Sequence, residues 1–384
     1  MQDNKRRVGI DLGLAEFHYR APGTARYVID QALALFKLEV PWRWIPIVRS
    51  KENPLWESIE QWNPVVAPGA KASIRSLTTV GRALAKSRCD LAYSPGGLLP
   101  LTRLPVFGTF FDSSLYEYGN LWSATGMRRQ MILLTFLAGY ALRKADVLFI
   151  NSEYCKDVMV KVKPRFAHKF IVNYPGAPQI SATPKAPEWA DKITKPFALS
   201  AGAFSENKNQ RRLLEAWIYL QRKFPDLPQL VLVGPAPAEY LEQVIMPLAR
   251  TAPRPHDILL PGLVSEDELA WNFQRCMFYI HPSIAEGCSS FSNYIAMEVS
   301  APIACANTTS HPEALAHAAE YFDPFSVDSM SNAIERMCQD EQLRLRLAEA
   351  GRQRIQNFTW EKNAQIVADS ILRRLSGQPS VHRS

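Results

Sequence analysis

The chain has 384 residues, of which 47% are hydrophobic and 21% are charged. This composition is typical of a globular protein of two or three domains, and it excludes a disordered or fibrous chain. No run reaches the roughly 18 apolar residues that a membrane span requires, and Asp11 interrupts the N-terminal run that a secretion signal would need. The six cysteines are scattered without a Cys-x-x-Cys pair, which is typical of a reducing compartment. We therefore expect a cytoplasmic protein.

The formal net charge is +7, and it is distributed unevenly. Residues 1–185 hold 25 Lys or Arg and 14 Asp or Glu, whereas the remainder holds 19 and 23. Such asymmetry suggests that the first half faces an anionic partner. A solvated basic surface without a partner explains the charge equally well.

Short runs rich in β-branched and aromatic residues alternate with longer helical patterns, which predicts βαβ units and parallel sheets, an α/β fold. Helices are predicted at Ala25–Phe36 and Arg128–Arg143 in the first half. The predicted strands there are Val8–Leu14, Trp42–Arg49, Asp90–Tyr93, Pro105–Phe111, Val147–Asn151 and Phe170–Tyr174.

The second half continues the same alternation. Its predicted strands are Phe197–Ala201, Gln229–Val233, Asp257–Leu260, Met277–His281 and Pro302–Ala306. Its predicted helices are Gln210–Lys223, Ala238–Ala249, Glu266–Arg275, Ser290–Val299 and Glu361–Leu375. Ser265–Glu268 and Ser310–Glu313 both have the spacing of a capping box, in which a serine and a glutamate satisfy the first turn of a helix.

The proline-rich segment Pro175–Pro196 has no clear period and is predicted to link two domains. We expect an N-terminal Rossmann-like domain over residues 1–180 and a C-terminal one over residues 196–360. A final helix and tail, residues 361–384, should return to the first domain.

Two glycine patterns test other α/β classes. Gly9-x-Asp11-x-Gly13 is how sugar kinases begin, but a single match is weak and the second half has no matching aspartate. An ATP-using sugar kinase therefore stays a distant alternative. A dinucleotide oxidoreductase is disfavoured because no Gly-x-Gly-x-x-Gly follows the first strand.

The second half contains a more specific pattern. Gly202 directly follows a predicted strand, and Lys208 lies six residues later, close to a helix start, where an ammonium and backbone amides can converge on one anion. Glu286 precedes a turn of small residues, Gly287–Ser290, whose amides would face a phosphate at the carboxyl edge of the sheet. A carboxylate beside such a turn would serve another part of the ligand, such as sugar hydroxyls or a developing cation.

Taken together, these motifs resemble the retaining glycosyltransferases of family 4, which have the GT-B fold. The resemblance extends from Val8 to about Leu375 and is strongest over Ala198–Pro324. It rests on Gly202…Lys208-Asn209, Pro282-Ser283-Ile-Ala-Glu286-Gly287, Pro302, Pro312-Glu313, Asp323-Pro324, Phe358-Thr-Trp360 and Pro22-Gly-Thr-Ala-Arg-Tyr27. It implies two Rossmann-like parallel-sheet domains that face a cleft.

The resemblance also implies a set of roles. Lys208 would neutralise the nucleotide diphosphate, Glu286 would contact the transferred sugar, and Gly23 would close over the phosphates. We expect Glu286 and Asp112 to be the catalytic residues. The expected donor-binding residues are Gly23, Gly202, Lys208, Gly262, Val264, Gly287, Cys288, Ser289, Ser290, Phe291 and Tyr294.

Sugar transfer passes through an oxocarbenium-like transition state while negative charge grows on the leaving diphosphate, and these residue types suit both charges. No Asp-x-Asp motif occurs in the sequence, so we expect neither a metal nor another cofactor. The expected donor is a nucleotide-diphosphate sugar, and a mannose-like hexose is favoured.

Three positions depart from the family pattern. Tyr294 replaces the second glutamate, Phe111 replaces the histidine before Asp112, and Ala203 replaces an arginine. Two functions follow: an active transferase with a remodelled donor pocket, or a catalytically degenerate GT-B-fold binding or scaffold subunit of a glycan-synthesis complex. The retained Lys208 and Glu286 favour the enzyme.

The acceptor is expected to be a glycan or a lipid-pyrophosphate-linked saccharide in polysaccharide biosynthesis, including lipopolysaccharide, and no nucleic acid is expected. Met131–Leu142 is apolar but too short to span a bilayer, so a buried helix is favoured there. The basic first half is also compatible with peripheral contact with an anionic membrane, on the inner membrane face.

Overall fold

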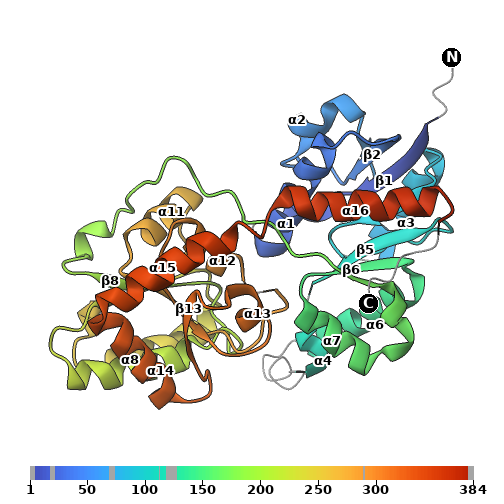
Figure 1. The fold of residues 1–384 in the computed structure, drawn as a ribbon. Coiled ribbons are helices and arrows are strands. Elements are labelled where there is room, and N and C mark those ends of the chain that lie inside the picture. Colours follow the sequence, from blue (N-terminus) through green and yellow to red (C-terminus); the bar gives the residue numbers. More distant parts are fainter. Residues whose placement is uncertain are drawn as a thin grey trace. The chain divides into compact units, whose positions relative to one another are not determined.

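The computed structural model of the protein describes residues 5–17, 22–68, 74–111, 113–117, 128–288 and 290–378. Within these ranges the chain forms two compact α/β domains (Figure 1). The first domain holds residues up to 117, residues 128–178 and residues 358–378; the second holds residues 179–357. The boundary after Pro178 lies in the proline-rich segment, which has few residues that can extend a strand or a helix.

The first domain is built on a seven-stranded parallel sheet with the order β3-β2-β1-β4-β5-β6-β7. Every residue of β4, β5 and β6 is buried, as expected for strands that helices cover on both faces. The strands are β1 (Arg6–Asp11), β2 (Trp42–Val48), β3 (Val65–Val66), β4 (Leu91–Ser94), β5 (Val106–Phe110), β6 (Val147–Ile150) and β7 (Phe170–Val172).

The helices of this domain are α1 (Pro22–Lys37), α2 (Trp56–Ile59), α3 (Ile74–Lys86), α4 (Ser114–Glu117), α6 (Arg128–Lys144), α7 (Glu153–Val162) and α16 (Trp360–Leu375). Helix α1 starts at Pro22, three residues before the predicted start. Proline suits the first helical position because its missing N–H has no partner there in any case. Residues 22–24 therefore belong to the helix, although the predicted helix left them out.

The last helix of the chain, α16, packs against α1 (Figure 1). The Asn363 amide joins the two helices, because its Oδ1 accepts a 2.6 Å hydrogen bond from Gln31 on α1. Its Nδ2 donates to the carbonyl of Tyr174, after β7, at 2.8 Å. The Trp360 ring meets Tyr27 edge-on, with centroids 5.2 Å apart. These buried contacts anchor α16 to the first domain.

The second domain has a six-stranded parallel sheet with the order β10-β9-β8-β11-β12-β13. Its core lies between this sheet and the apolar face of α8, where Leu213, Leu214 and Trp217 are fully buried. The strands are β8 (Phe197–Ala201), β9 (Gln229–Val233), β10 (Ile258–Gly262), β11 (Phe278–His281), β12 (Ile303–Ala306) and β13 (Ala319–Phe322).

Its helices are α8 (Gln210–Lys223), α9 (Ala238–Tyr240), α10 (Met246–Arg250), α11 (Glu266–Arg275), α12 (Phe291–Glu298), α13 (His311–Leu315), α14 (Val327–Gln339) and α15 (Glu341–Ile355). The single helix predicted over residues 238–249 is divided by a π-helical segment, Leu241–Ile245. Pro247 follows two residues after Ile245, in the first turn of α10, and its missing N–H removes one bond of the regular ladder at this place.

The two predicted capping boxes have different outcomes. Ser265 and Glu268 form a complete capping box at the start of α11, as predicted. Ser310 makes no capping hydrogen bond at α13, because its backbone is helical, with φ −81° and ψ 0°, where an N-cap residue is extended. That second prediction was wrong; the Ser310 hydroxyl donates to the backbone carbonyl of Glu286 at 2.9 Å.

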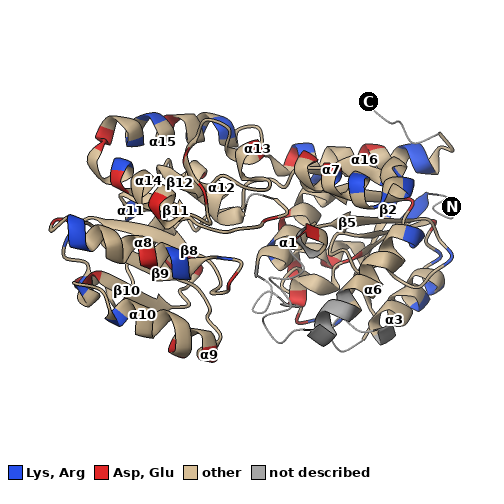
Figure 2. Ribbon diagram, turned by 90° about the horizontal axis from the view of Figure 1, so that it is seen from below, with Lys and Arg blue, Asp and Glu red and all other residues tan. Residues whose placement is uncertain are grey.

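Charged residues of both signs are spread over the helices of each domain (Figure 2). Several of them pair along one helix, such as Arg211 with Glu215 on α8 and Arg352 with Glu349 on α15. Among the described residues, no helix combines the length and apolar character that crossing a bilayer would demand.

Candidate functional site

The candidate site lies at the carboxyl edge of the second sheet, where β8 and β11 are hydrogen-bonded neighbours. Lys208 lies in the turn after β8, two residues before α8 begins, and Glu286 lies in the loop after β11. The carboxyl ends of parallel strands form the edge at which open α/β sheets bind ligands. The topology therefore brings together two residues that are 78 positions apart in the chain.

The Glu286 carboxylate has three cationic or polar neighbours at one oxygen atom. Its Oε1 forms an ion pair with Lys208 Nζ and accepts a 2.8 Å hydrogen bond from Ser283 Oγ. His281 Nε2 lies 3.6 Å from the same oxygen, which is longer than a hydrogen bond. The side chains of Lys208 and Glu286 remain 25% and 14% exposed, so both are accessible to a ligand.

These neighbours control the charge of the carboxylate. Burial alone would raise the pKa of Glu286, but the Lys208 ammonium, together with His281 and His311, holds it well below its usual range. Glu286 is therefore ionised at neutral pH. A fixed negative charge of this kind stabilises positive charge that develops on a bound ligand.

Hydrogen bonds from distant segments fix the backbone around Glu286. Its N–H donates to Thr309 Oγ1 at 3.2 Å, and its carbonyl accepts from Ser310 Oγ at 2.9 Å. On the other side, Asn207 Nδ2 donates to the Ala285 carbonyl at 3.0 Å, and Asn209 Nδ2 donates to the Pro282 carbonyl at 3.1 Å. The loop that carries the carboxylate is thus tied both to the Lys208 turn and to the segment before α13.

Two buried histidines lie behind the carboxylate. His281 ends β11, and its Nδ1 lies 2.8 Å from the Tyr279 hydroxyl. His311 begins α13 and meets the His281 ring edge-on, with centroids 4.9 Å apart. Burial lowers the pKa of both histidines, that of His311 to about 3, so both are neutral at pH 7. Neither histidine was predicted to belong to the site. The position of His281 at the end of a predicted strand, directly before Pro282-Ser283, was a signal in the sequence.

Glycines lie at the ends of three neighbouring strands, β8, β9 and β10. Gly202 and Gly262 are open: no described atom lies within 4 Å of the place that a Cβ would take. Gly234 was not predicted. A Cβ at this residue would lie 2.0 Å from the Gly202 carbonyl oxygen, so only glycine allows the two strand ends to approach so closely. The glycine directly after the Gln229–Val233 strand was its signal in the sequence.

The structure also places the other residues predicted for the donor. In the second domain, Gly287 is buried and Cys288 is half-buried in the loop, Ser290 caps α12, and Phe291 begins that helix. Val264 is half-buried just after β10. Gly23 is exposed in the first turn of α1, in the first domain. Asp112 and Ser289 lie outside the described residues.

Tyr294 lies on α12 and is 1% exposed, with its ring edge-on to Phe291. A tyrosine in this position is packed as part of the core of its domain. Contact between its hydroxyl and a ribose stays a prediction.

An ion pair also lies at the carboxyl edge of the first sheet, where β1 and β2 end. Arg49, after β2, makes two contacts with the Asp11 carboxylate, at 2.9 and 3.0 Å. The guanidinium lies over Gly13, where an added Cβ would be 2.4 Å from Arg49 Cζ. The Arg49 guanidinium therefore occupies the space beside the Gly9-x-Asp11-x-Gly13 turn.

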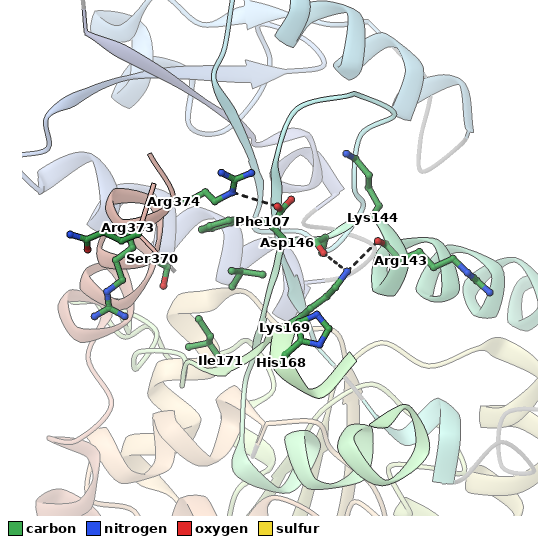
Figure 3. A pocket seen from close by; sticks show the side chains of 13 residues that line it. Phe107, Arg143, Lys144, Asp146, His168, Lys169, Ile171, Ser370, Arg373 and Arg374 are labelled. Atoms are coloured by element: carbon green, nitrogen blue, oxygen red, sulfur yellow. Dashed lines mark hydrogen bonds and ion pairs between the residues drawn. The ribbon is translucent and has the colours of Figure 1, made fainter. Parts of the chain in front are cut away.

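A cavity of about 370 Å³ lies in the first domain, at the ends of α6 and α16 (Figure 3). Lys169 lines it and donates to the carbonyls of Leu142, Arg143 and Ala145 at 3.0, 3.2 and 2.6 Å. Arg374 Nε lies 3.5 Å from Asp146 Oδ1. Basic side chains commonly stabilise the free carbonyls of a helix C-terminus in this way. Part of the basic excess of the first half thus has a structural use, and contact with an anionic membrane stays a prediction.

Both the sequence of the second domain and the fold have counterparts among known proteins. Residues 184–354 match the sequence model of the family described as glycosyl transferases group 1. Over 165 residues the chain is 29% identical to the O-antigen chain mannosyltransferase B of Escherichia coli. This match covers 43% of this chain and 42% of that protein. Over 187 residues the chain is 24% identical to the serotype-specific mannosyltransferase WbdA of Escherichia coli. That match covers 48% of this chain and 23% of WbdA. The matched regions span less than half the length of these relatives.

The fold has solved counterparts. Sucrose-phosphate synthase from Thermosynechococcus elongatus superposes with a TM-score of 0.71 at 16% identity, covering 97% of this chain and all of that one. HepE from Anabaena, solved in complex with UDP, superposes with a TM-score of 0.67 at 16% identity, with the same coverage. With its two parallel-sheet domains, this chain has the GT-B fold, as the resemblance predicted.

Proposed function

We propose, from the match of residues 184–354 to the sequence model of the group 1 glycosyltransferases, that this protein is a retaining hexosyltransferase that uses a nucleotide-diphosphate sugar. The observation that carries the proposal is the meeting of Lys208 and Glu286 at one strand edge. The reaction develops negative charge on the leaving diphosphate and positive charge on the sugar. An ammonium and an ionised carboxylate within contact of each other match these two charges.

In this proposal Lys208 binds the diphosphate, and Glu286 faces the sugar. Glu286 and Asp112 are the proposed catalytic residues, and no metal or other cofactor takes part. The donor would also contact the strand-end glycines, the loop before α12 and the first turn of α1, through Gly23, Gly202, Gly262, Val264, Gly287, Cys288, Ser289, Ser290, Phe291 and Tyr294.

The matched relatives support mannose as the transferred sugar, because both are named mannosyltransferases. We propose an acceptor that is a glycan or a lipid-pyrophosphate-linked saccharide in polysaccharide biosynthesis. Action at the cytoplasmic face of the inner membrane, with peripheral contact, is part of the same proposal.

The test is a transfer assay with purified protein, in which radiolabelled GDP-mannose and UDP-glucose are offered with a mannoside acceptor. We expect transfer from GDP-mannose with retention at the anomeric carbon, and its loss in Lys208→Ala and Glu286→Gln. Glu242→Gln, an exposed glutamate elsewhere in the same domain, is the matched control. If nucleotide binds but no donor supports transfer, the degenerate binding or scaffold subunit replaces this proposal.

A further inference from the structure

The Lys208–Glu286 ion pair has a consequence for the proposed reaction. If Lys208 turns to the diphosphate when the donor binds, the Glu286 carboxylate loses its cation just when it must face the sugar. Two other side chains then lie near Glu286 Oε1: Ser283, with its Oγ at 2.8 Å, and His281, with its Nε2 at 3.6 Å. Something must then hold an ionised, 14% exposed carboxylate in place, because a buried charge without partners is costly.

The hydrogen bonds behind His281 determine which of its ring nitrogens carries the proton. The Tyr279 hydroxyl has one hydrogen and three acceptors within reach: His281 Nδ1 at 2.8 Å, the Ala201 carbonyl at 3.3 Å and the Ser292 hydroxyl. The shorter contact favours donation to Nδ1. Ser292 Oγ also donates to the Ala201 carbonyl at 3.3 Å, so this oxygen is satisfied without Tyr279.

A neutral histidine that accepts at Nδ1 carries its proton on Nε2. The N–H then points toward the anionic Glu286 oxygen. The opposite tautomer would place a lone pair against the carboxylate, which is repulsive. Electrostatics and hydrogen-bond length thus favour the same tautomer.

Packing keeps the ring in this orientation. His281 is 3% exposed, and His311 is fully buried edge-on against it. Charged and titratable groups surround the pair on each side: Lys208 from the turn after β8, Tyr279 on β11, Cys305 on β12 and His311 on α13. A small shift of the carboxylate toward the ring is enough to convert the 3.6 Å approach into a hydrogen bond.

We propose that Tyr279 and His281 form a donor relay that positions Glu286: the Tyr279 hydroxyl donates to His281 Nδ1, and His281 Nε2–H donates to the Glu286 carboxylate once Lys208 turns to the diphosphate. No proton is transferred. His281 is a positioning residue, and Tyr279 acts through it. This inference rests on the proposed function for the partners of Lys208 and Glu286, but the tautomer itself does not depend on it.

The first measurement needs no activity. Long-range proton–nitrogen NMR of the histidine side chains reports which ring nitrogen is protonated, and the His281 signal is identified by its absence in His281→Gln. We expect the Nε2–H form in the wild type and a loss of this preference in Tyr279→Phe. A wild-type ring protonated at Nδ1 overturns the relay.

The second measurement is the kinetics of transfer. Because the transition state develops the charge that Glu286 faces, His281→Leu should lower kcat about tenfold and change the KM for the donor less than twofold. Removing a donor to a carboxylate raises its pKa, so the acid limb of the kcat profile should move to higher pH. His281→Gln retains an N–H donor and should recover most of kcat.

If His281→Leu and His281→Gln lose equal amounts of kcat and the acid limb of the kcat profile does not move, His281 only fills space. That result overturns the relay. Thermal unfolding of both variants shows whether they are folded. If the wild-type protein transfers no sugar while the Nε2–H tautomer is observed, the proposed function fails. The hydrogen bond from Tyr279 to His281 is then still supported.

Discussion

The two domains use the same strand edge in different ways. In the first domain, Arg49 meets both oxygens of Asp11, and Asp11 also accepts a hydrogen bond from the Gly13 N–H at 3.1 Å. These side chains are 11% and 8% exposed. In the second domain, Lys208 and Ser283 share one oxygen of Glu286, and His281 lies close by.

The difference follows from the chemistry of the two cations. A guanidinium is planar and matches a carboxylate with two parallel contacts, whereas an ammonium is a point charge on a flexible stem. The Asp11–Arg49 pair is therefore suited to fixing loops. The Lys208–Glu286 pair is suited to exchanging partners, and four predictions test this distinction.

The largest expected effect is structural and lies in the first domain. Asp11→Asn leaves the Arg49 cation without its anion and should destabilise this domain by about 3 kcal/mol, the cost of breaking a buried pair. Hydrogen exchange of the β1 and β2 amides measures the change. Nucleotide affinity should stay the same, and a large loss of affinity with unchanged exchange would contradict the distinction.

Glu286→Gln should act on turnover. The amide keeps the shape of the side chain but not the charge that stabilises a sugar cation, so kcat should fall about 100-fold, or about 2.7 kcal/mol. Nucleotide affinity, measured by calorimetry, should change less than threefold. Full activity at saturating donor would show that Glu286 does not have the proposed role.

Lys208→Ala should act on binding. A hydrogen bond to a charged group is worth about 1.5–3 kcal/mol, so the affinity for GDP should fall at least tenfold. GMP, which lacks the second phosphate, is the matched control ligand. The affinity for GMP should fall less than the affinity for GDP. Equal losses for both nucleotides would place Lys208 away from the diphosphate.

The smallest effect is a pH dependence of stability. Because Lys208 and the histidines outweigh burial and hold the pKa of Glu286 below its usual value, ionisation favours the folded state. This contribution is complete above the usual glutamate pKa and is lost as the pH falls toward the lower folded value. The stability of the wild type relative to Glu286→Gln should therefore decline on acidification below about pH 4.5. A difference that is constant from pH 7 to pH 3 would show that the pair does not perturb Glu286.

Much of the fold could be predicted from local patterns. The strands Phe197–Ala201 and Gln229–Val233 and the helix Gln210–Lys223 were predicted to the residue, because each is a continuous buried run or has a clear helical period. Strand β3 was missed because it has only two residues, and β13 was missed because its run Ala319–Phe322 contains a glutamate.

The site was predicted in part for similar reasons. Lys208 and Glu286 were visible because each follows a strand and belongs to a motif. Ser310 and Thr309 were not predicted as partners of Glu286, because a hydrogen bond across 23 or 24 residues leaves no local pattern. The capping interpretation of Ser310 failed because its backbone is helical rather than extended, which the serine–glutamate spacing alone does not show.

The sequence by itself determined the alternation of strands and helices, the residue types at the strand ends and therefore the edge at which chemistry can occur. Only the tertiary structure decided which partner each charge meets. Arg49 lies 38 residues from Asp11, and Lys208 lies 78 residues from Glu286. An ion pair needs its atoms within about 4 Å, and that distance depends on the crossovers and loops between the strands rather than on local sequence.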